Sequence, residues 1–145
     1  MGRIYLMEQA QTQITVTLNG RGMTDITRQV ATWLAQTGIH TGVLHLFVQH
    51  TSCSLLIQEN ADPTVQSDLE RFLSRLVPDG DAIFQHTAEG ADDMPAHVRA
   101  ALTATSLSIP VGQGKMTLGI WQGIYLYEHR QQPSTRRIIA HITGC

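Results

Sequence analysis

Two histidines and three acidic residues fall within twelve positions, in the segment from His86 to His97. Imidazole nitrogens and carboxylate oxygens are the ligands with which proteins hold zinc and related divalent ions while one coordination position stays open. A glycine inside the segment lets it fold back, so the two histidines could meet. A plainer interpretation also fits, in which Asp92 or Asp93 caps the following helix and His97 is a surface or interface residue.

A third histidine is placed by strand periodicity. In the apolar stretch 42–50, Leu44, Leu46 and Val48 share one face, and His50 stands at the end of that row. This side chain is therefore expected at the mouth of a sheet, at the edge of the core. His45 lies on the other face in mid-strand, which favours a core or interface histidine whose nitrogens are satisfied by hydrogen bonds.

The stretch 115–128 places a carboxylate among apolar residues. By the same alternation Gln122 and Glu128 share the face of Ile124, while Trp121 lies on the opposite face. A buried glutamate without a partner is costly, so Glu128 should meet a metal, an arginine or a substrate group. Arg130 stands just beyond it as a candidate donor to an anion. The alternative is a strand buried between two layers, with aromatic residues that pack as ordinary core.

Nucleophilic catalysis is not indicated by the residues around position 53. Ser52 and Ser54 lack the G-x-S-x-G surroundings of a serine nucleophile. Cys53 follows His50 closely, which makes a Cys–His nucleophile conceivable, but a small inert cysteine in a half-buried strand is the commoner case.

Short strands and two to three helices must position these residues. Strands are predicted at 11–18, 42–50, 53–58, 106–111, 115–128 and 137–142; the third is predicted as the hairpin partner of the second, and 21–27 could pair back on the first. Helices are predicted from residue 26 to near Gly38, from the cap Asp62 and Pro63 to Leu76, and from about Met94 to Thr105. A polar, acidic loop is expected at 85–95. The predicted class is therefore α+β, a largely antiparallel β-sandwich with two to three flanking helices.

Composition limits the class of protein further. The 145 residues suit one domain, 1–145, and 42% hydrophobic with 15% charged residues excludes a disordered chain. A net charge of −2 disfavours nucleic acid as a partner, and no apolar run approaches the ~18–20 residues that a membrane span needs. The first residues lack the apolar core of a signal peptide, and Cys53 and Cys145 form no disulfide or metal pattern. We therefore expect a cytoplasmic protein that binds neither nucleic acid nor membrane.

Several short motifs, in one order over most of the chain, resemble the YjbQ-like family, also called secondary thiamine-phosphate synthases. The likeness runs from about residue 40 to Gly144. Its motifs are His50-Thr-Ser-Cys-Ser-Leu, Glu59-Asn-Ala-Asp-Pro, Asp68-Leu-Glu, His86, Glu89-Gly-Ala-Asp-Asp-Met-Pro-Ala-His97, Ile109-Pro-Val, Gly119-Ile-Trp-Gln-Gly-Ile-Tyr and Glu128-His-Arg. Cys53, Gln58 and Ile120 depart from the residues usual in the family, and none of the three departures removes a candidate ligand.

The resemblance implies a β-sandwich that assembles as a homotrimer, a divalent-metal site at the histidine and acidic positions, and a weak thiamine-phosphate synthase-like activity. On this basis the predicted metal ligands are His50, His86, His97 and Asp92. The predicted catalytic residues are Glu128, Gln122 and Asp93, and the residues predicted to bind a phosphorylated small molecule are Trp121, Arg130 and Asn60. The ion is expected to be zinc or similar, with magnesium for a pyrophosphate substrate.

Three other functions stay open at this point. The trimer could bind a metal or a phosphorylated metabolite without turning it over, the histidines and acids could hold the subunit interface together, or the metal could serve hydrolysis of a phosphoester. Turnover of the two thiamine precursors separates the synthase from a binding protein, and histidine substitutions that dissociate the trimer would indicate the interface role.

Overall fold

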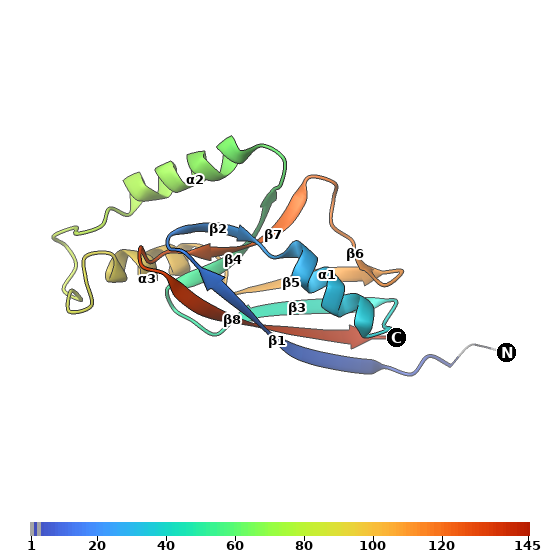
Figure 1. Cartoon of the computed structure of the whole chain (residues 1–145). Helices are drawn as coiled ribbons and strands as arrows, with labels where there is room; N and C mark the ends of the chain where they lie inside the picture. The colour runs from blue at the N-terminus through green and yellow to red at the C-terminus, as the bar shows by residue number, and fades with distance from the viewer. Residues whose placement is uncertain (1, 3) are drawn as a thin grey trace.

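The computed structural model describes residue 2 and residues 4–145; the other two N-terminal positions, included in the predicted domain, lie outside the described residues. Over the described residues the elements follow in the order β1 (Glu8–Leu18), β2 (Gly22–Asp25), α1 (Thr27–Gln36), β3 (Gly42–Val48), β4 (Cys53–Glu59), α2 (Pro63–Leu76), α3 (Asp93–Leu102), β5 (Ser106–Gly112), β6 (Lys115–Met116), β7 (Gln122–Glu128) and β8 (Ser134–Gly144) (Figure 1). This confirms the predicted α+β class, with two antiparallel sheets and, in this part of the chain, three helices.

The two sheets enclose one core. The larger sheet has the strand order β1-β8-β3-β5-β6 and the smaller one β2-β7-β4. In Figure 1 the smaller sheet and the helices lie on one side of the larger sheet. Leu44 and Ile138 of the larger sheet and Leu55 and Leu126 of the smaller one belong to the same core cluster, and all four are fully buried. Removing this apolar surface from water is the main favourable contribution to folding.

Two predicted strand pairings are wrong. The segment 53–58 forms no hairpin with 42–50, because β4 pairs along its length with β7 while β3 pairs with β5 and β8. Likewise β2 pairs with β7 in the smaller sheet and not with β1. In both cases a short connection carries the chain from one sheet to the other. Local alternation shows that a segment is a strand but does not show whether the next strand lies beside it or in the facing layer.

The predicted long strand 115–128 is interrupted. Its first part is β6, its last part is β7, and the residues between them include a turn. The Gln122 N–H donates to the Gly119 carbonyl over 3.0 Å, and the Gly119 N–H donates to Gln122 Oε1 over 2.7 Å. Gly119 therefore lies at a turn that ends the predicted long strand. Every residue of β7 from Gly123 to Glu128 is buried, so this strand lies between two layers, as the alternative interpretation of the stretch predicted.

The helix signals are borne out at α2 and only in part at α3. The Asp62 carboxylate accepts the Thr64 N–H over 2.9 Å at the start of α2, with Pro63 as its first residue, as predicted. Helix α3 ends at Leu102, three residues before the predicted end, and Asp92 makes no side-chain capping bond. In the described part of the chain no helix is long and apolar enough to cross a membrane.

Gly42 and Gly144 oppose each other where β3 meets β8, and a Cβ atom at Gly42 would collide with the Thr143 carbonyl oxygen. We expect Gly42→Ala to lower the free energy of unfolding by about 1–3 kcal/mol, the range found for overpacked sites. Gly112→Ala in the same sheet is the matched control, since its Cβ would meet only a Thr117 methyl group at 3.6 Å. Urea denaturation measures both variants, and equal losses would contradict the steric explanation.

Candidate metal site

Three side chains converge at the start of α3. His86 comes from the loop between α2 and α3, whereas Asp93 and His97 come from the helix itself. The Asp93 Oδ2 atom lies 2.7 Å from His86 Nε2 and 3.4 Å from His97 Nε2. One ligand atom from each residue lies within 4.8 Å of the other two. We call these three residues the His–Asp group; its two helical members meet because residues four apart share one face of a helix.

A backbone contact fixes which nitrogen of His97 is free. Its Nδ1 atom lies 2.9 Å from the carbonyl oxygen of Thr51. Because a carbonyl oxygen only accepts, Nδ1 carries a proton, so in the neutral ring it is Nε2 that offers a lone pair, on the side of Asp93. A ring N–H bonded to a backbone carbonyl is also how histidine ligands of metals are held in orientation. The donor set therefore fits a divalent ion, and the partly exposed rings of His86 and His97 open it to solvent.

Arg130 supports the carboxylates from the other side. Its Nη1 donates to Asp93 Oδ1 over 2.5 Å, its Nε to Asp92 Oδ2 over 3.1 Å, and its Nη2 to the Glu89 carbonyl over 2.9 Å. Asp93 thus offers one oxygen to the arginine and the other to the imidazoles. All three guanidinium nitrogens of Arg130 contact the protein, which places this residue as a support of Asp93 and not at a free phosphate position.

Asp92 is turned away from the His–Asp group, contrary to the prediction that made it a ligand. Its Oδ2 accepts the Gln131 N–H over 2.9 Å in addition to the bond from Arg130. Burial alone would raise the pKa of Asp92, but these bonds outweigh it and lower the pKa. Neighbouring helical residues point about 100° apart, so the point at which α3 begins decides that Asp93, and not Asp92, faces the histidines.

His50 lies outside the His–Asp group, also contrary to the prediction. Strand β3 ends at Val48, so the alternation that placed His50 at the end of the core row does not extend to it. Its Nε2 accepts the Arg137 N–H over 2.9 Å. Burial, reinforced by Arg136 and Arg137, lowers the pKa of His50 and favours the neutral ring.

Glu128 finds an arginine, one of the three partners predicted for it. The side chain is fully buried, and its carboxylate accepts hydrogen bonds from Arg136 Nε and Nη2 over 2.6 and 2.5 Å, from Ser134 Oγ over 2.8 Å and from the Arg130 N–H over 3.0 Å. Burial alone would raise the pKa of Glu128, but Arg136 and the other donors lower it. With both oxygens occupied by the protein, Glu128 is a structural anion here and not a base with access to substrate.

Three further predicted residues lie together at the opposite end of β7. Asn60 Nδ2 donates to the carbonyls of Ile120 and Gln122 over 3.3 and 3.4 Å, and Trp121 next to them is 61% exposed. Strand β7 separates this end from Glu128 by about 20 Å, at ~3.4 Å per residue. One chain therefore does not bring Asn60, Trp121 and Gln122 to the His–Asp group.

A second polar network lies under α2 and was missed in the sequence. Glu70 accepts hydrogen bonds from the fully buried Arg99 over 2.9 and 3.1 Å and from the Tyr127 hydroxyl. Burial alone would raise the pKa of Glu70, but Tyr127 and Arg99 lower it. The network ties α2 to β7 and α3. The available signal was Arg99 itself, which shares a helix face with the buried Pro95 and Ala96, four and three residues before it.

His129 lies buried beside this network, with Nε2 2.8 Å from Ser54 Oγ. Burial, followed by the charge of Arg99, lowers the pKa of His129 from 6.5 to about 4. The unfolded chain therefore takes up a proton that the folded chain does not, and stability falls as the pH drops from 6.5 toward 4. We expect His129→Gln to flatten that part of the pH profile in urea denaturation, with the exposed His40→Gln as control. An unchanged slope in His129→Gln would contradict this prediction.

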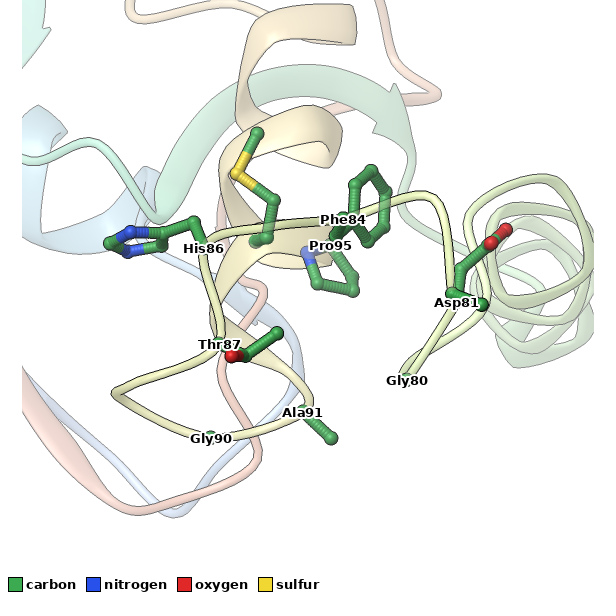
Figure 2. Close-up of a pocket in the computed structure, with 10 residues that line it drawn as sticks. Gly80, Asp81, Phe84, His86, Thr87, Gly90, Ala91 and Pro95 are labelled. Carbon is green, nitrogen blue, oxygen red and sulfur yellow. The ribbon is translucent and has the colours of Figure 1, made fainter.

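A hollow of about 290 Å³ adjoins the loop that carries His86. Phe84, Met94 and Pro95 form much of its wall. Figure 2 shows Phe84 and Pro95 next to each other, whereas the His86 ring points to the other side of the loop. His86 nevertheless lines the hollow, which therefore borders the His–Asp group through this residue. The size of the hollow lies just below the usual range for ligand sites.

The chain is similar to known proteins over nearly its whole length. Residues 12–145 match the family described as UPF0047 protein YjbQ-like. A UPF0047 protein of Synechocystis is 44% identical over 94% of this chain and 92% of its own length, and the UPF0047 protein YjbQ of Escherichia coli O157:H7 is 45% identical over 92% and 97%. Among solved structures, a YbjQ-like protein of Sulfolobus solfataricus superposes with a TM-score of 0.87 at 25% identity over 97% of this chain and 100% of that one. A yjbq/upf0047 family protein of Clostridium acetobutylicum gives 0.82 at 32% identity over 90% and 98%.

Proposed function

The chain belongs to the YjbQ-like (UPF0047) family, and from this membership and the geometry of the His–Asp group we propose that it is a metal-dependent enzyme acting on a phosphorylated small molecule. The proposed ligands of the divalent ion are His86, Asp93 and His97. The reaction proposed from the family resemblance is thiamine-phosphate synthase-like: a thiazole phosphate nitrogen attacks the methylene carbon of a pyrimidine diphosphate, and the bond to the diphosphate breaks.

The observation that best supports this proposal is the contact between His97 Nδ1 and the Thr51 carbonyl. It selects Nδ1 as a donor nitrogen of His97 and leaves Nε2 as the nitrogen that would bind an ion beside the Asp93 and His86 ligand atoms. Three protein ligands would leave a coordination position open, and an ion held by them would neutralise charge that develops on a leaving diphosphate.

The other residues of the site would act through these three. Arg130 holds Asp93 by one oxygen and leaves the second for the ion. Asp93 is 3% exposed, so little water would compete with an ion for the oxygen that Arg130 leaves free. The half-exposed His86 lies on the solvent side, from which a substrate would approach.

Metal content and turnover of the purified full chain test the proposal. After treatment with a chelator, we expect titration calorimetry to show one zinc or similar ion bound per chain, and product from the two thiamine precursors only when the ion is present. His40→Gln, an exposed histidine outside the group, is the control for His97→Ala. A chain that binds no divalent ion overturns the proposal. If the chain binds the ion but yields no product, the proposed synthase-like activity is overturned and only the proposed metal binding is retained.

A further inference from the structure

A second hollow, of about 570 Å³, lies between helix α1 and the hairpin that β5 and β6 form. Figure 1 shows this hairpin beside α1, at the end of the molecule that carries the C-terminus. The volume falls within the range of roughly 300–1,000 Å³ that small-molecule sites occupy. None of the residues that line it belongs to the His–Asp group or lines the hollow beside His86. We call this space the α1–β6 hollow.

Small and apolar side chains form most of the walls of the α1–β6 hollow. On α1, Ala31, Leu34 and Ala35 follow at the spacing of one helix face. Met116 and Leu118 line the hollow from the other side and pack in part against the core. The two alanines leave space that longer side chains would fill. An apolar molecule that enters this space would remove its own surface and that of the walls from water.

Lys115 gives the α1–β6 hollow a single charge. It is the only charged residue in the lining and the only lysine of the chain. None of the ion pairs between described residues includes it. A hydrogen bond from an ammonium group to an anion is stronger than one between neutral groups. The lining therefore complements a molecule that combines an apolar body with a negative charge.

The turn next to Lys115 holds a glutamine in a conformation that glycine adopts more readily. Gln113 and Gly114 connect β5 to β6 with φ values of 53° and 74°, and a type I′ hairpin turn needs positive φ at both positions. Gln113 is the only described residue other than glycine with a positive φ. The Gly114 N–H donates to the His40 carbonyl over 2.9 Å, which ties the turn to the segment after α1.

This strain points to a use for the Gln113 side chain. Strained backbone positions cluster where proteins bind ligands, because a residue that relaxes the strain would lose the function. Gln113 lines the hollow together with Lys115, and its amide group can donate to an anion. Two donors, one of them charged, thus stand at the same end of an apolar space.

We propose that the α1–β6 hollow binds a small molecule with an apolar body and one carboxylate, of the class of medium-chain fatty acids. The alkyl chain would lie between α1 and the segment with Met116 and Leu118, and the carboxylate would meet Lys115 and Gln113. One lysine balances the single charge of a carboxylate, whereas a phosphate monoester carries close to two charges at pH 7. A peptide that adds as a strand would find only the two residues of β6 to pair with. This proposal does not depend on the metal site.

Titration calorimetry of the full chain with octanoate tests the proposal. We expect saturable binding of one octanoate per chain, and at least tenfold weaker binding of octyltrimethylammonium, which has the same alkyl chain and the opposite charge. Lys115→Met should lower the affinity for octanoate at least tenfold and leave the affinity for the neutral 1-octanol unchanged. Arg28→Met, which changes an exposed arginine of α1 outside the lining, is the matched control and should bind octanoate like the parent.

Two further variants test the place and the strain. Ala31→Phe fills the hollow and should abolish binding of both octanoate and 1-octanol, whereas Ala101→Phe, at an exposed alanine of α3, should not. Gln113→Gly removes a side-chain donor and relaxes the turn. We therefore expect at least threefold weaker octanoate binding in Gln113→Gly, with a urea midpoint equal to or above that of the parent.

Each other outcome overturns a stated part. Absence of saturable octanoate binding overturns the proposal, and unchanged affinity in Ala31→Phe removes the hollow as the site. Equal binding of octyltrimethylammonium, or unchanged affinity in Lys115→Met, removes the anionic group, and tighter binding of octyl phosphate than of octanoate removes the carboxylate. Circular dichroism shows whether each variant is folded, and Ala35→Leu takes the place of Ala31→Phe if that variant is not. The same titrations on chelator-treated protein keep a failure here distinct from a failure of the metal site.

Discussion

Replacing Arg136 with methionine is expected to lower the free energy of unfolding by about 3–5 kcal/mol, the range found when one partner of a buried ion pair is removed. Glu128 is fully buried and receives two of its four hydrogen bonds from Arg136. Without the guanidinium, the carboxylate keeps only the Ser134 hydroxyl and the Arg130 N–H. Neither donor carries a charge, so the negative charge of Glu128 would stay buried without compensation. Urea denaturation at pH 7 measures the loss.

The double variant Glu128→Leu/Arg136→Met separates the effect of an unpaired buried charge on stability from the effect of altered packing at the site. Because apolar replacement of both partners is often neutral, we expect most of the lost stability to return. Arg71→Met is the surface control, since its pair with Asp68 on α2 is exposed and should contribute at most about 1 kcal/mol. A loss in Arg136→Met no larger than in Arg71→Met would contradict a stabilising role of the buried pair.

The contribution of Glu128 to stability depends on pH with opposite signs in the parent protein and in Arg136→Met. In the parent protein the pKa of Glu128 is lowered, so its contribution is present above the pKa of the unfolded chain and is lost as the pH falls through the folded value. In Arg136→Met the burial of Glu128 is no longer opposed by the arginine, and the neutral form is favoured. The penalty of Arg136→Met should therefore shrink between pH 7 and pH 4. Measuring unfolding across that range checks the direction.

Local signals in the sequence were sufficient where neighbours in the chain determine the structure. The Asp62-Pro63 pair begins α2, because a capping carboxylate and a proline without an N–H act only on the first turn. Strand alternation likewise placed Glu128 on the same face as Ile124, and the cost of burying a carboxylate predicted that it would meet a metal, an arginine or a substrate group. That the partner is Arg136 depends on where β8 begins, which local pattern does not determine.

The candidate site shows why the rest could not be read from pattern. His86 and His97 meet because a short loop and one helix turn hold them together. The prediction named Asp92 as the ligand, whereas Asp93 lies beside the histidines. This error follows from a one-residue uncertainty in the start of α3, a boundary that local propensity defines poorly. The separation of Trp121 from the His–Asp group is set by the length of β7 and its pairing with β4, which are properties of the assembled sheet.

Replacing Asp93 with asparagine is expected to weaken divalent-ion binding at least 100-fold, if the His–Asp group is the metal site. The substitution keeps the size of the side chain but removes the only anionic ligand of the group, and carboxylate and imidazole ligands together set the affinity for such ions. Asp92→Asn is the matched control, because this neighbouring aspartate points to Arg130 and Gln131. Titration calorimetry with zinc should show a near-parent affinity for Asp92→Asn.

Arg130→Gln distinguishes the ligand from its support. This arginine contacts Asp93 Oδ1, while Oδ2 faces the two imidazoles, so its loss should misorient the carboxylate without removing it. Supporting residues of this kind typically change metal affinity by ~10–100-fold, a smaller loss than that expected for Asp93→Asn. Equal affinities of Asp93→Asn and Asp92→Asn would move the ion away from the His–Asp group. Arg130→Gln could instead lose more affinity than Asp93→Asn. That result would show that the bound species contacts the arginine and not the carboxylate, and the ligand would then be an anion.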